Sequence, residues 1–64
     1  MKEIKYKIID ILKDMNQNKD TIIGVIAFLQ KEEDAKEMLR WLNEHKNDKP
    51  TQHEIIDYLD VLTL

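Results

Sequence analysis

The sequence contains no cysteine and no serine, and it has only one glycine, one proline and one arginine in 64 residues. Without cysteine, neither a disulfide framework nor a thiolate zinc site can stabilise the chain, so its stability must come from packing. Without serine and cysteine, the usual nucleophiles of catalytic triads are missing as well. The longest uninterrupted apolar run, residues 22–29, is far shorter than the ~18 residues that a membrane span requires. We therefore expect a cytoplasmic protein with no membrane partner.

The residues that are present describe one small domain that spans residues 1–64. Hydrophobic residues make up 42% of the chain and charged residues 36%, with a net charge of −3, which indicates a folded chain rather than a disordered one. A domain of this size buries only about 60% of its unfolded surface, so its stability is marginal and is often supplemented by self-association.

Apolar residues recur at the spacing of an amphipathic helix in the first, third and last parts of the chain. The three stripes are Ile4, Ile8, Ile11, Leu12 and Met15; Ala35, Met38, Leu39 and Leu42; and Ile55, Tyr58, Leu59 and Leu62. The second of these segments begins with three acidic residues and ends with His45 and Lys46, which suits the helix dipole at both ends.

The segment from Thr21 to Gln30 is apolar almost all round, so periodicity alone does not distinguish a strand from a helix. A single strand would leave its backbone unpaired, which favours a buried helix. Gly24 weakens that helix by about 1 kcal/mol relative to alanine, and we expect it to permit a close helix–helix approach or a bend. Asn18 or Asp20 is suited to cap its start.

Turn signals separate most of these helices. Neither glycine nor proline divides the second helix from the third, but the apolar stripe changes phase there, and we expect a tight break near residues 31–33. Before the last helix, Pro50 is expected to hold Lys49 in an extended conformation. Thr51 and Glu54 then form the pattern of a capping box.

These features predict an all-α fold, a compact bundle of about four short helices at roughly 2–15, 20–30, 32–46 and 51–62, joined by short connections.

Few residues are arranged for chemistry. His53 and Asp57 lie one helical turn apart, like part of a zinc-binding motif, but Glu54 is already explained as a cap and a third ligand is missing. His45 is explained by its place at a helix end. Asp57 and Asp60 are typical of a solvated helix face. We therefore expect no catalytic residue, no metal, no cofactor and no enzymatic activity.

Charge bears on nucleic-acid binding. The residues 1–31 carry a net charge of about +2 and the residues 32–64 about −5, by counting. The start of the last helix resembles the opening of a helix-turn-helix unit, but that helix presents carboxylates and no cation to DNA phosphates. A DNA-binding or DNA-mimicking regulator is therefore the alternative function, with nucleic acid disfavoured as a direct partner.

The main functional hypothesis rests on a surplus of large apolar residues. A short four-helix bundle covers only two or three sides of each helix, whereas the second helix is apolar on every side. Trp and Tyr are favoured interface anchors because they bury much area and keep a polar tip. The candidate interface residues are Phe28, Trp41, Ile56, Tyr58, Val61 and Leu64. We expect a protein partner or a homo-oligomer.

The run from Thr21 to Leu29, followed by the run from Lys36 to Leu42, resembles short helical proteins encoded by Firmicutes genomes and their mobile elements. The resemblance covers roughly residues 8–60 and favours a bacterial cytoplasmic origin. It implies no activity and no functional residue.

Overall fold

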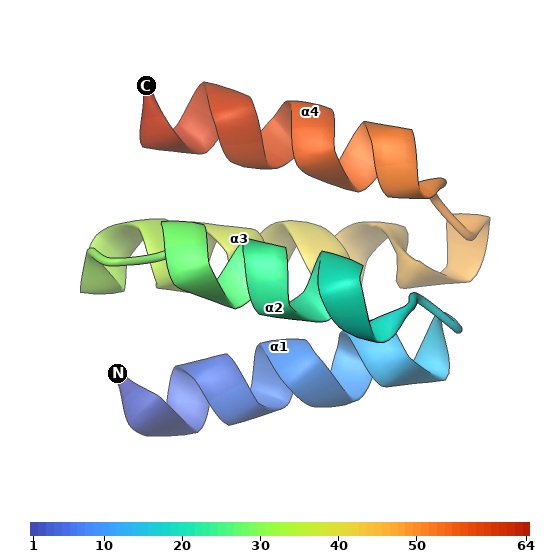
Figure 1. Cartoon of the computed structure of the whole chain (residues 1–64), viewed down its shortest axis with the longest axis horizontal. Coiled ribbons are helices and arrows are strands. Elements are labelled where there is room, and N and C mark those ends of the chain that lie inside the picture. Colours follow the sequence, from blue (N-terminus) through green and yellow to red (C-terminus); the bar gives the residue numbers. More distant parts are fainter.

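The computed structural model describes all 64 residues, and every regular element in it is helical (Figure 1). The elements are α1 (Lys2–Asp14), α2 (Lys19–Phe28), α3 (Glu32–His45), the short 3₁₀ helix η1 (Lys46–Asp48) and α4 (Gln52–Thr63). The predicted all-α bundle of four helices is confirmed, and each predicted boundary lies within two residues of the observed one.

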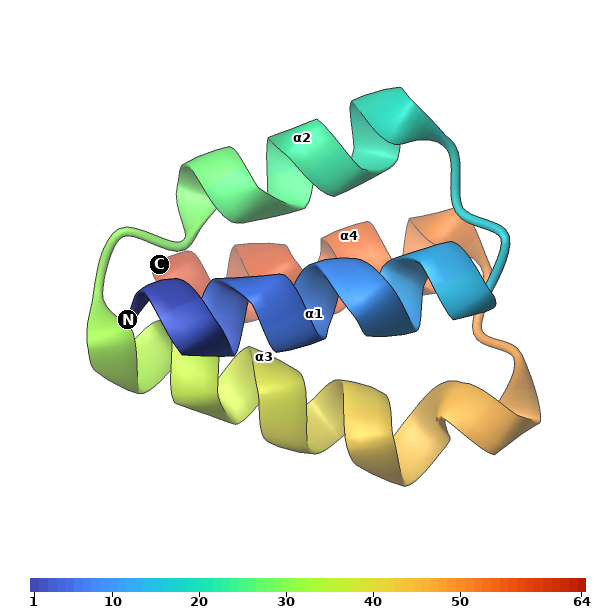
Figure 2. The same cartoon turned by 90° about the horizontal axis from the view of Figure 1, so that it is seen from below.

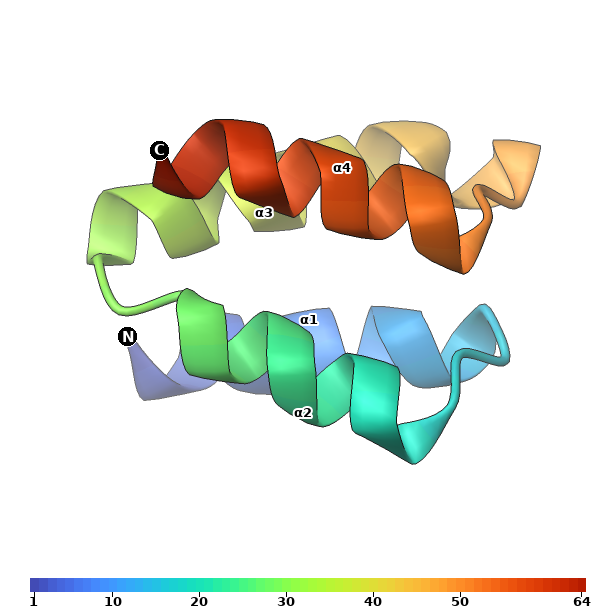
Figure 3. The same ribbon diagram turned by 45° about the horizontal axis from the view of Figure 1, so that its top comes forward.

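Successive helices run in opposite directions, and both chain ends lie at the same end of the bundle (Figure 1). α1 packs against α2 and α3, and α4 packs against the same two helices. Figure 3 shows the resulting two layers, one made of α1 and α2 and the other of α3 and α4. The two layers also differ in net charge. Residues 1–31, which include α1 and α2, are basic overall, and residues 32–64, which include α3 and α4, are acidic.

Each helix contributes to one core of nine fully buried apolar residues. They are Ile8, Leu12, Val25, Leu29, Ala35, Met38, Leu42, Ile55 and Leu59. On α1, α3 and α4 these residues belong to the predicted stripes, and the remaining stripe residues are packed against the core from its edges. The helical spacing of apolar residues therefore identified the buried face of these three helices.

Two asparagine residues, Asn16 and Asn18, shape the connection between α1 and α2. Asn16 adopts the left-handed conformation with φ of 61°, which asparagine tolerates better than most residues. The backbone amide of Gln17 donates to the carbonyl of Leu12 at 3.0 Å, and the backbone amide of Asn16 donates to the carbonyl of Lys13 at 2.9 Å. These two bonds form the Schellman motif at the end of α1. Of the two predicted caps for α2, Asn18 is the one used: its Oδ1 accepts from the Thr21 amide at 2.8 Å.

The predicted break between the second and third helices is present, two residues earlier than expected. α2 ends at Phe28 and α3 begins at Glu32. Leu29 leaves helical geometry with ψ of 77°, and Lys31 is extended. Because the Leu29 side chain is fully buried, we attribute the break to the core contact of this residue rather than to a helix-breaking residue type.

The expected extended conformation of Lys49 is wrong. Lys49 is left-handed, with φ of 52° and ψ of 60°, and its amide donates to the carbonyl of Lys46 at 3.3 Å. This turn follows η1 directly and delivers Pro50 to a buried position. Closing the 3₁₀ turn and burying the proline ring decide this conformation against the local preference of a residue before proline.

The capping box predicted at the start of α4 is present. The hydroxyl of Thr51 accepts from the amide of Glu54 at 3.2 Å, and the carboxylate of Glu54 accepts from the amide of Thr51 at 3.1 Å. Both bonds satisfy backbone donors that have no partner within the helix.

Gly24 does not serve the close approach that we expected of it. A Cβ atom added to Gly24 meets no heavy atom within 4 Å, and α2 continues through this position without interruption. The glycine is thus on an open side of α2.

No helix of the chain has both the length and the apolar character needed to cross a membrane.

Candidate functional site

The six predicted interface residues fall into two groups in the structure. Phe28, Val61 and Leu64 are exposed, with 60% of Phe28 and 67% of Val61 accessible to solvent. The other three, Trp41, Ile56 and Tyr58, are half-buried and pack against the core. Trp41, Ile56 and Tyr58 therefore pack at least partly within the bundle. Phe28, Val61 and Leu64 are accessible to another molecule.

The half-buried aromatic residues form a stack between α3 and α4. The rings of Trp41 and Tyr58 lie 4.7 Å apart with an angle of 11° between their planes. His45 stacks on Trp41 at 4.6 Å, and its Nδ1 donates to the carbonyl of Trp41 at 2.8 Å. Stacking across α3 and α4 therefore engages both aromatic side chains in packing within the chain.

The outer side of α2 carries apolar residues instead of the polar residues usual on a helix surface. Ile23 and Phe28 are 55% and 60% exposed, and Ala27 between them is exposed as well. The buried residues of the helix, Thr21 and Val25, lie opposite Ile23 and Ala27, whereas Phe28 follows Val25 by three residues and is exposed at the C-terminal end of the helix. In Figure 2, α2 forms an edge of the bundle, with no other helix outside it. This outer face therefore has no partner within the chain.

A shallow opening lies at the C-terminal end of this face. Its volume is about 310 Å³, and its lining includes Phe28, Lys31, Asp34, Leu62 and Leu64. The structure thus brings two predicted interface residues, Phe28 of α2 and Leu64 directly after α4, to the same opening. Val61 is not among its lining residues.

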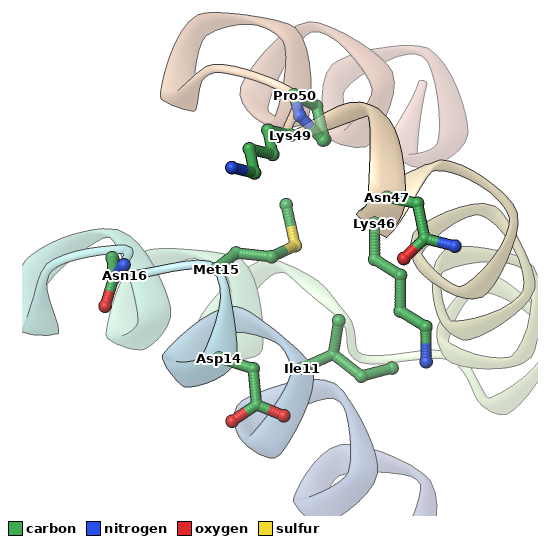
Figure 4. A pocket seen from close by; sticks show the side chains of 8 residues that line it. All are labelled: Ile11, Asp14, Met15, Asn16, Lys46, Asn47, Lys49 and Pro50. Carbon is green, nitrogen blue, oxygen red and sulfur yellow. The ribbon is translucent and has the colours of Figure 1, made fainter.

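A second opening of about 420 Å³ lies between the C-terminal end of α1, η1 and the segment Lys49–Pro50 that precedes α4 (Figure 4). Its floor is apolar, from Ile11 and Met15, and Asp14, Lys46 and Lys49 stand around it. The ammonium groups of the two lysines point in different directions in Figure 4 and do not converge on one point. A pair of cations that holds an anion needs such convergence.

Two surface ion pairs lie on α3 and share Arg40. Arg40 Nη2 donates to Glu37 Oε2 at 2.7 Å, and Nη1 donates to Glu44. The hydrogen bond and the positive charge of Arg40 lower the pKa of Glu37, and the same interaction raises the pKa of Arg40. All three side chains are exposed, so this network holds a solvated face of α3 together and is not part of a pocket.

The histidine and aspartates considered for chemistry are all on the surface. His53, Asp57 and Asp60 of α4 are exposed. No group of three or more His, Asp or Glu side chains is close enough to hold a metal ion.

Sequence reasoning missed Ile23 and Tyr6 as surface residues. Ile23 is 55% exposed and Tyr6 is 56% exposed. For Ile23, the apolar residues on all sides of α2 indicated that one side remains uncovered, but not which side. Tyr6 lies beside the stripe of α1, outside the face that the bundle buries.

The chain matches no family model, no curated protein and no solved structure.

Proposed function

We propose that this chain is a non-enzymatic protein–protein interaction module, self-association included, that acts through its exposed apolar side chains. The observation that carries the proposal is the exposed apolar surface of α2, where Ile23 and Phe28 are both more than half exposed although large apolar residues contribute most when buried. Exposed apolar side chains with no charged residue between them, as at Ile23 and Phe28, are typical of an interaction site.

Light scattering after size-exclusion chromatography tests the proposal. The monomer has a mass of 7.7 kDa, and we expect a larger mean mass as the concentration rises from micromolar to millimolar. The double variant Ile23→Gln with Phe28→Gln should shift the mean mass towards the monomer. Tyr6→Gln is the matched control, because Tyr6 is equally exposed but lies on α1.

A partner other than a second copy requires a second measurement. Affinity capture from a bacterial lysate with the wild-type chain and with the double variant should then yield a protein that only the wild-type chain retains. A monomer at every concentration, together with identical captured proteins for both chains, would contradict the proposal.

A DNA-related regulator is the alternative. α4 exposes Glu54, Asp57 and Asp60 and contains neither lysine nor arginine, so this helix repels phosphates. We therefore expect no retardation of mixed-sequence duplexes at low salt. Retardation that weakens steeply with added salt would support a DNA-binding function, and release of a basic DNA-binding protein from its duplex would support a DNA mimic.

A further inference from the structure

We draw no further inference here: the strongest candidate, the exposed apolar side of α2 around Ile23 and Ala27, carries none because nothing in the structure shows what covers it.

Discussion

α2 and α3 follow one another in the chain, but they use their apolar residues in opposite ways. In α3 three apolar residues, Ala35, Met38 and Leu42, are fully buried, and the outward face carries ion-paired Arg40, Glu37 and Glu44. In α2 only Thr21 and Val25 are buried, while Ile23 and Phe28 remain more than half exposed. Apolar character therefore indicates burial only where it is confined to one side of a helix.

The difference has a physical cause. Within the bundle, α2 contacts α1 and α4, and these contacts leave its outer side open to solvent. Exposing apolar surface forgoes stabilisation of about 25 cal/mol for each Å² that would otherwise be buried. The outward residues of α3 are charged, so little apolar surface is left exposed there. The exposed apolar surface of α2 would add stability only if another molecule buried it.

The largest test of this comparison is Leu42→Ala in α3. Leu42 is fully buried, so removing its side chain leaves a cavity and should lower the free energy of unfolding by about 2–5 kcal/mol. Such a loss is a large part of the stability of a 64-residue domain, and the variant is expected to be partly unfolded at 25 °C. Urea denaturation followed by circular dichroism measures the change. Ile23→Ala in α2 is the counterpart and should cost no more than about 0.5 kcal/mol.

Thr21→Val should stabilise the chain. Thr21 is 4% exposed, and its Oγ1 has no hydrogen-bond partner. Replacing an unpaired buried hydroxyl with a methyl group of similar shape should raise the free energy of unfolding by about 1 kcal/mol. Thr51→Val is the matched control, since it removes the capping hydroxyl of α4 and should lower the same quantity by about 1 kcal/mol. A loss of stability in Thr21→Val would mean that its hydroxyl has a partner in solution.

Gly24→Ala should also stabilise the single chain, by about 0.5–1 kcal/mol. The added methyl group meets no heavy atom within 4 Å, and alanine loses less backbone freedom than glycine in a helix. Thermal unfolding at low micromolar concentration measures the change in the absence of association. An unchanged or lower midpoint would show that this position of α2 is not open.

The smallest effect is expected from Glu37→Gln on the polar face of α3. The hydrogen bond and charge of Arg40 lower the pKa of Glu37, so the carboxylate stabilises the folded chain above its unfolded pKa. This contribution is lost as the pH falls through the lowered pKa. The variant should therefore unfold at a slightly lower temperature than the wild type at neutral pH, and the two midpoints should converge in strong acid. A difference that persists in acid would point to another cause.

The candidate site was only partly accessible from the sequence. Phe28 and Val61 were expected at an interface and are exposed, but Trp41 and Tyr58 were expected there for their residue type, and their mutual stacking became visible only when α3 and α4 were placed side by side. Ile23 was missed because no sequence pattern tells which side of an all-apolar helix is covered.

The sequence by itself determined the elements that depend on near neighbours. The helices, the capping box of Thr51 and Glu54, and the buried stripes of α1, α3 and α4 follow from contacts within a few residues and from regular spacing. Tertiary structure decided the left-handed conformation of Lys49, the burial of Thr21 and the face of α2 left open. Each of these depends on segments distant in the chain, whose packing outweighs local preferences of about 1 kcal/mol per residue.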